Sequence, residues 1–97
     1  MGGVLIEDDV LLGPNVQIFS SDHIVDPDKM PRGALKETFH PVVIGKNVWV
    51  GASCILLSKT NIPNNTVIGA GCVVRERVSG SGLYIEDRKL FMKRAFE

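Results

Sequence analysis

The chain has 97 residues, of which 11 are basic and 11 acidic, so its formal net charge is zero. This balance gives no overall field for binding nucleic acid or an anionic membrane, and no apolar run reaches the roughly 20 residues that span a bilayer. With 44% hydrophobic and 23% charged residues, the composition predicts one globular domain. The N-terminus lacks the basic and apolar stretches of a signal peptide, so we expect a cytoplasmic protein.

From Ile6 onward the sequence repeats in units of six. The units are "IEDDVL", "LGPNVQ" and "IFSSDH", then, after an interruption, "IGKNVW", "VGASCI", "LLSKTN", "IPNNTV", "IGAGCV" and "VRERVS". The first position is always Ile, Leu or Val, the second favours Gly, and the third and fourth carry turn formers. The fifth is small or β-branched, except at Asp22. A period of six suits neither a helix nor a long strand, so we predict short strands separated by corners.

Three units would close one triangular coil, which places residues 18 apart above one another in ladders about 4.8 Å apart. The first and fifth positions then fill the interior, and Gly or Asn takes the φ > 0 conformations of the corners. Cys54 and Cys72 are 18 apart and form no CxxC motif. We therefore expect stacked small core residues here, with no metal or redox role.

The interruption covers residues 24–43 and contains "DPDKMPRGALKETF", whose prolines, glycine and mixed charges predict a protruding loop. His23 lies just before it, in "FSSDHIVDP". Taken alone, His23 is either a solvated loop residue or a reactive group at a break in a rigid scaffold. His40, in "FHPVVIG", is interpreted as loop structure or an acceptor-pocket residue. Trp49 is at an outward-facing sixth position, which favours a ligand or subunit contact.

The domain organisation follows from the repeat. We predict a β-helix over residues 1–79, with the loop insertion at 24–43, and a C-terminal cap over residues 80–97. Apolar segments on either side of "EDRK" predict a hairpin for this cap, with a short helix as the alternative.

The segment "PVVIGKNVWVGASCIL", followed by "IPNNTVIGAGCVV", resembles the hexapeptide-repeat acyltransferases, in particular the galactoside, maltose and xenobiotic O-acetyltransferases. The resemblance implies an all-β fold, a left-handed parallel β-helix. It also implies acetyl-CoA as the acyl donor and a small hydroxyl acceptor, such as a sugar or an antibiotic. The family assembles as a homotrimer with its active sites between adjacent prisms.

The resemblance also implies roles for single residues. His23 matches the family's general base, and the backbone N–H of Ala52 matches the donor that holds the thioester oxygen. A histidine suits the first task because its unperturbed pKa is about 6.5, and fixed amides suit the second because they stabilise an oxyanion with little reorganisation. Asn15 is a candidate substrate-binding residue. Asp22 either orients His23 or caps the turn.

Further positions match the family's contacts to CoA. Trp49 corresponds to an aromatic beside the thioester, and Gly51 leaves room for the thioester. Ala70 corresponds to a backbone contact to the pantetheine arm, and Arg75 to a position near the far end of CoA. The match at Arg75 is looser, because Glu76 follows it where the family has Lys.

Two alternatives remain open from the sequence. The repeat begins almost at Met1, so a truncated, non-catalytic β-helix trimer that binds CoA or a partner is the first. A zinc-dependent γ-class carbonic anhydrase of the same fold is the second, but it needs three histidine ligands per site and this chain has two histidines. We expect no bound metal.

Overall fold

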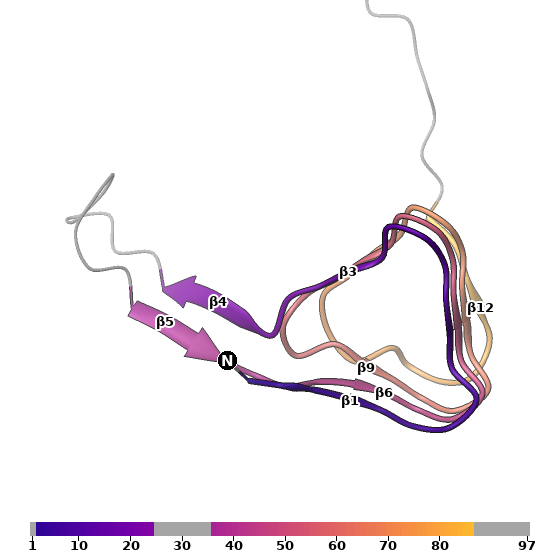
Figure 1. The fold of residues 1–97 in the computed structure, drawn as a ribbon, viewed down its shortest axis with the longest axis horizontal. Coiled ribbons are helices and arrows are strands. Elements are labelled where there is room, and N and C mark those ends of the chain that lie inside the picture. Colours follow the sequence, from indigo (N-terminus) through magenta and orange to yellow (C-terminus); the bar gives the residue numbers. More distant parts are fainter. Residues whose placement is uncertain (1, 25–35, 87–97) are drawn as a thin grey trace, which may run out of the picture.

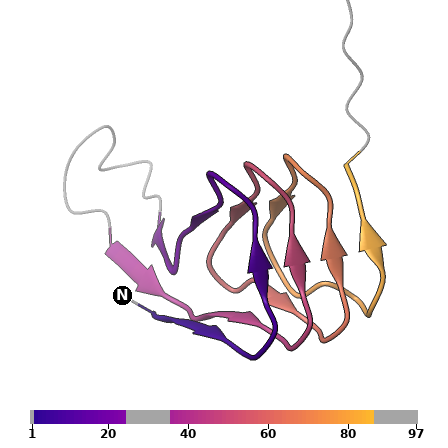
Figure 2. The ribbon, with the colours of Figure 1, turned by 45° about the vertical axis from the view of Figure 1, so that its right-hand side comes forward.

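The computed structural model describes residues 2–24 and 36–86. Over this range the chain winds into stacked triangular coils of short strands, seen along the coil axis in Figure 1 and from the side in Figure 2. The first coil comprises residues 4–20, the second residues 42–58 and the third residues 60–76. The described residues contain no helix, and so none that could cross a membrane.

Three parallel sheets form the sides of the triangle. Sheet A contains β1 (Val4–Ile6), β6 (Val42–Ile44) and β9 (Asn61–Ile62). Sheet B contains β2 (Leu11–Leu12), β7 (Trp49–Val50), β10 (Val67–Ile68) and β12 (Leu83–Tyr84). Sheet C contains β3 (Gln17–Ile18), β8 (Ile55–Leu56) and β11 (Val73–Val74). Each strand pairs with the strand one coil away, so sequence relatives lie side by side.

The register confirms the predicted spacing of 18. Trp49 faces Val67 in sheet B, and Ile55 faces Val73 in sheet C. Backbone hydrogen bonds join the coils at regular intervals; for example, the N–H of Trp49 donates to the carbonyl of Thr66 at 3.0 Å. The pattern also crosses the interruption, because Leu11 faces Trp49. The repeat therefore resumes in phase after the inserted segment.

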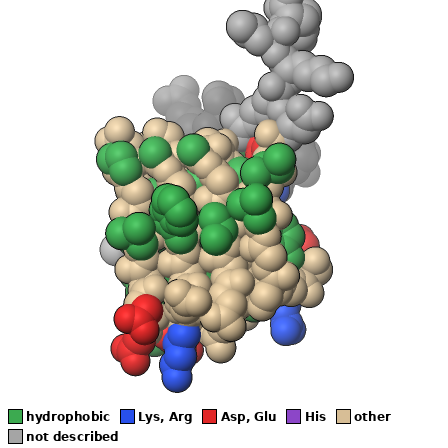
Figure 3. Space-filling view, turned by 90° about the vertical axis from the view of Figure 1, so that its right-hand side faces the viewer, with side chains coloured by type: hydrophobic (Ala, Val, Ile, Leu, Met, Phe, Trp, Pro, Cys, Tyr) green, Lys and Arg blue, Asp and Glu red, His purple; other side chains and the backbone are tan. Residues whose placement is uncertain are grey.

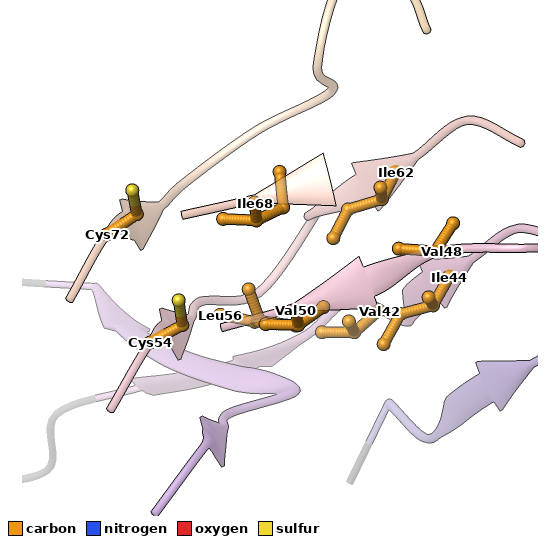
Figure 4. Close-up of a cluster of buried hydrophobic side chains, with 9 residues drawn as sticks. All are labelled: Val42, Ile44, Val48, Val50, Cys54, Leu56, Ile62, Ile68 and Cys72. Atoms are coloured by element: carbon orange, nitrogen blue, oxygen red, sulfur yellow. The ribbon is translucent and has the colours of Figure 1, made fainter. Parts of the chain in front are cut away.

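The core lies inside the second and third coils, as the first and fifth positions of the repeat predict. Its hydrophobic members are drawn in Figure 4: Val42, Ile44, Val48, Val50, Cys54, Leu56, Ile62, Ile68 and Cys72. Thr60 and Thr66 occupy two fifth positions and are also buried. Cys54 and Cys72 stack in this column and are 0% and 4% exposed, which confirms that they are small core residues.

The first coil is less covered than the second. Ile6 and Leu12 are 43% and 38% exposed, whereas Ile44 and Val50, which stack on them, are fully buried. The reason is positional, since the described residues place a coil on only one side of the first. The aliphatic column therefore begins to bury its side chains fully only in the second coil.

Corner conformations differ in part from the sequence prediction. Positive φ angles occur at the fourth position of the repeat, at Asp9, Asn15, Asn47, Ser53, Lys59, Asn65 and Gly71. The second-position glycines do not share this conformation, so the prediction was wrong for them. They allow close stacking instead: a Cβ on Gly51 would lie 2.6 Å from the nitrogen of Ala70, and a Cβ on Gly13 would lie 2.7 Å from that of Ala52.

An antiparallel pair projects from the prism where the first coil ends. We call this pair, β4 (Ser21–Ile24) and β5 (Lys36–Phe39), the arm; Ser21 faces Phe39 at its base (Figure 1). Of the predicted loop insertion, residues 24–43, both ends are therefore strand, and β6 already belongs to the second coil. Residues 25–35 lie outside the described residues.

The parallel stacking continues past residue 79. Leu83 of β12 faces Val67 of β10, and the hydroxyl of Tyr84 accepts a hydrogen bond from the N–H of Gly80 at 3.0 Å. Residues 87–97 of the predicted cap lie outside the described residues. The division into residues 1–79 and 80–97, with a hairpin or helix at the end, stays a prediction.

Candidate functional site

The three corners of the prism differ in chemistry, and they organise the predicted site. The first corner, residues 8–9, 46–47 and 64–65, joins sheet A to sheet B. The second corner, residues 14–15, 52–53 and 70–71, joins sheet B to sheet C. The third corner, residues 58–59, joins sheet C back to sheet A, and the arm leaves from the same corner in the first coil (Figure 1).

The second corner has backbone N–H groups without protein acceptors. The N–H of Gly51 donates to the carbonyl of Ile68 at 2.8 Å, and that of Ser53 donates to the carbonyl of Pro14 at 2.9 Å. Between them, the N–H of Ala52 has no acceptor among the described residues, and the same is true of Ala70 one coil later. An amide that is fixed by its neighbours but open to a ligand is the kind of donor that stabilises an oxyanion.

The first corner shows why these amides stay open. There the N–H of Lys46, which is the equivalent of Ala52, donates to Oδ1 of Asn64 at 2.7 Å. Asn64 lies 18 residues after Lys46, as Ala70 lies 18 residues after Ala52. A methyl side chain offers no acceptor, so Ala70 cannot cap Ala52 in the way that Asn64 caps Lys46.

The face of sheet B beside these amides is apolar. Trp49 is 54% exposed, and it stands in one outward ladder with Leu11, Val67 and Leu83. Figure 3 looks onto this face, where hydrophobic side chains gather over the strands and charged side chains lie along the lower edge. The exposure of Trp49 confirms the outward direction expected from the repeat.

The structure brings part of the predicted site together. Five of the candidates lie at the second corner or on the adjoining strand β7: Asn15, Trp49, Gly51, Ala52 and Ala70. They come from three successive coils, so the stacking of the repeat aligns them along the prism. This group has an aromatic wall and two open amide donors.

The remaining candidates lie elsewhere. Asp22 and His23 are on β4 of the arm, which leaves from the third corner, and all of sheet C separates that corner from Ala52 (Figure 1). Arg75 follows β11 on the far side of sheet C and shares a pocket of about 210 Å³ with Lys59. One chain alone does not place His23 beside the amides of the second corner.

His40 connects β5 to β6. It is half-buried, and its N–H donates to the carbonyl of Ser20 at 3.0 Å. This bond ties the base of the arm to the first coil, which agrees with the structural interpretation of His40. Within residues 2–24 and 36–86 no group of three or more His, Cys, Asp or Glu side chains could hold a metal ion.

Sequence reasoning missed two features. The first is the contrast between Asn64 and Ala70, whose signal was present once the units were aligned 18 residues apart. The second is Lys59, which lies beside Arg75 although it is 16 residues away in sequence. It could have been found by the same alignment, because the third corner brings these neighbouring coils together.

Comparison with known proteins agrees with this fold. Residues 41–76 match the family model described as bacterial transferase hexapeptide (six repeats). With its stacked triangular coils, the chain is a hexapeptide-repeat protein whose fold is a left-handed parallel β-helix. Within this class it is similar to galactoside and maltose O-acetyltransferases, which confirms the resemblance found in the sequence.

The individual matches cover most of this chain. It is 40% identical over 75 residues to a galactoside O-acetyltransferase of Lactococcus lactis, a match of 77% of this chain and 35% of that protein. It is 35% identical over 75 residues to the galactoside O-acetyltransferase of Escherichia coli, which matches 77% of this chain and 36% of that protein. The chain thus spans about a third of the length of these relatives.

A solved structure of a maltose O-acetyltransferase from Clostridium difficile superposes with a TM-score of 0.75 at 37% identity, over 86% of this chain and 43% of that one. The N-acyltransferase AntD of Bacillus cereus superposes with a TM-score of 0.72 at 17% identity, over 88% of this chain and 49% of that one. The second match shows the shared fold alone.

Proposed function

We propose that this chain forms an acetyl-CoA-dependent O-acetyltransferase, whose reaction takes place at the second corner of the prism. The observation that carries the proposal is the open N–H of Ala52, which has no acceptor among the described residues while its equivalent, Lys46, is capped. The similarity to galactoside and maltose O-acetyltransferases supports an acetyl donor and a hydroxyl acceptor.

In the proposed reaction, the imidazole of His23 takes the proton of the acceptor hydroxyl as the oxygen attacks the thioester carbonyl. A C–O bond forms, and the carbonyl oxygen becomes an oxyanion that accepts a hydrogen bond from Ala52. The C–S bond then breaks, and the leaving thiolate takes the proton from the imidazolium. General-base catalysis of this kind contributes about 10²- to 10⁴-fold.

The binding of acetyl-CoA is proposed along the exposed residues that adjoin this corner. Trp49 offers an apolar surface beside the reacting thioester, and Gly51 has no side chain to fill the space at the corner. Ala70 offers a second open amide for the pantetheine arm. Arg75, with Lys59 beside it, supplies positive charge one side of the triangle away, where the phosphate-bearing end of CoA would lie.

His23 and Ala52 lie at different corners of one prism, so we propose that each active site forms between two chains of a homotrimer. The arm of one chain would bring His23 to the second corner of its neighbour. The exposed ladder of Trp49, Leu11 and Leu83 supports an assembly, because apolar surface of this kind favours a ligand or subunit contact. A cyclic trimer repeats one such contact three times and so builds three equal sites.

The test is release of free thiol from acetyl-CoA in the presence of a panel of sugars and other hydroxyl acceptors. We expect wild-type turnover and a loss of about 10²- to 10⁴-fold in His23→Ala. His40→Ala is the matched control, since it also removes one of the two imidazoles, and it should retain most of the activity.

If no acceptor releases thiol above the His23→Ala background while CoA still binds, the chain is a non-catalytic β-helix and the proposal fails. Equal losses in the two histidine variants would also contradict the assignment of His23 as the base.

A further inference from the structure

A second recess lies on sheet B, at the edge away from the reacting amides. It is a groove of about 340 Å³ at the first corner, and the proposed chemistry at the second corner does not use it. Two corner amides, one carboxylate and three apolar side chains line it: Asn47, Asn65, Asp9, Leu11, Trp49 and Val67. The groove therefore has a polar edge and an apolar wall.

The polar edge is a fixed row of side chains on successive coils. Asp9, Asn47 and Asn65 have φ angles of 61°, 54° and 57°, so all three corners share one left-handed conformation. Nδ2 of Asn47 donates to Oδ1 of Asn65 at 2.9 Å. This leaves Oδ1 of Asn47 as an acceptor, Nδ2 of Asn65 as a donor and the Asp9 carboxylate as an acceptor. The row repeats at about 4.8 Å, the spacing of neighbouring strands.

The apolar wall is the ladder beside this row. Trp49 stands between Leu11 and Val67 in register, and more than half of its surface is exposed. Figure 3 shows these strands from outside, with hydrophobic side chains above the charged lower edge of the face. An exposed indole between two aliphatic side chains presents a flat apolar surface next to alternating acceptors and a donor.

We propose that this groove binds a polyhydroxylated ring, as in a pyranose sugar, and that it is the remote subsite for the acceptor. Such a ring has an apolar face of C–H groups, which matches the indole, and a rim of hydroxyls that both donate and accept. A purely apolar ligand would leave the two amides unsatisfied. An anion would be repelled by Asp9.

This inference rests on the proposed function for its role, although the groove is defined independently of it. Along the chain, Trp49 lies between Asn47 of the groove and Gly51 of the second corner. A ring held at the first corner would therefore lie on the same sheet face as the open amide of Ala52. Contacts to this remote part of the acceptor position its reacting hydroxyl, which is how binding energy away from the chemistry raises the rate.

The chain offers a direct readout, because Trp49 is its single tryptophan. Titration of the full chain with methyl glucopyranoside should give a saturable change in Trp49 fluorescence. Cyclohexanol, which has the ring but one hydroxyl, should give at most a far weaker change. A saturating amount of CoA should leave the affinity for the saccharide within about two-fold, because the two ligands occupy different edges of sheet B.

Asn65→Gly is the variant of choice, because a φ of 57° suits glycine and the fold should be retained. Loss of its hydrogen bonds should weaken saccharide binding by about three- to ten-fold. Lys59→Gly is the matched control: it also replaces a side chain at positive φ, 72°, but at the third corner, and it should leave saccharide binding unchanged.

The proposal is overturned if no saccharide changes the fluorescence, if Asn65→Gly binds as the wild type does, or if CoA displaces the saccharide. Saccharide binding that depends on Asn65 in a protein with no acetyl transfer would refute the proposed function and leave the groove assignment intact. Acetyl transfer with no saccharide bound at Trp49 would do the reverse.

Discussion

The first and second corners of this prism are built from the same repeat, yet one is closed and the other open. At the first corner the N–H of Lys46 donates to the side chain of Asn64. At the second corner Ala70 replaces the asparagine, and the N–H of Ala52 has no acceptor among the described residues. One side chain decides whether a corner completes its own hydrogen bonds or presents a donor to a ligand.

The contrast also separates scaffold from site within a repeat. Both corners keep the bond from the fourth-position N–H to the third-position carbonyl one coil earlier, at 2.9 Å for Asn65 to Lys46 and for Gly71 to Ala52. Stacking is thus maintained at each corner, and only the third-position amide differs. A solenoid can carry a reactive position without weakening its ladder, because the ladder does not use that amide.

The largest expected effect comes from closing the open corner. Ala70→Asn places an acceptor where Asn64 stands at the first corner, so it should cap Ala52 and lower kcat by about 10²- to 10³-fold, the usual cost of losing one oxyanion donor. Thiol-release kinetics measure the change, and amide hydrogen exchange at Ala52 should slow.

Ala70→Leu has nearly the same shape as the asparagine variant but no acceptor, so it reports the effect of bulk alone. An equal fall in kcat in the two variants, with unchanged exchange at Ala52, would remove the cap as the explanation.

A smaller effect is expected from disturbing the stacking that both corners share. Gly51→Ala puts a Cβ 2.6 Å from the nitrogen of Ala70, so the coils must shift apart. We expect a loss of about 1–3 kcal/mol in the free energy of unfolding, as for other overpacked sites. Chemical denaturation measures this loss.

Gly80→Ala serves as the comparison, because nothing lies within 4 Å of its added Cβ. It should change the stability by less than about 1 kcal/mol. Similar losses in the two variants would mean that close stacking is not the reason for glycine at position 51.

The smallest effect is expected from opening the closed corner. Asn64→Ala removes the acceptor for Lys46 and should lower the free energy of unfolding by about 0.5–1.5 kcal/mol. Acetyl transfer should stay at the wild-type rate, since Lys46 has no part in the reaction. A drop in turnover as large as that of Ala70→Asn would show that the two corners are not functionally distinct.

Much of the fold could be predicted because the repeat is a direct record of stacking. Aliphatic residues every six positions predicted the interior, and the spacing of 18 predicted that Cys54 and Cys72 would stack; both are buried. The role of the second-position glycines was predicted wrongly, because close approach between coils is a property of two chain segments and not of one turn.

The candidate site was less accessible from sequence. The resemblance supplied His23, Ala52 and Trp49 as single positions, but not the fact that His23 lies on an arm at another corner. Which corner an insertion leaves from depends on the phase of the coil, and which amide remains open depends on a partner 18 residues away. The roles of these residues and the cytoplasmic location stay predictions.

The most direct test of the account is to mix two inactive variants. His23→Ala lacks the base and Ala70→Asn lacks the open donor, so each alone should be inactive. If each site combines the arm of one chain with the second corner of its neighbour, co-refolding equal amounts should restore about a quarter of the wild-type activity, because each intact half is present at half of the positions. A mixture as inactive as its components would contradict the shared site.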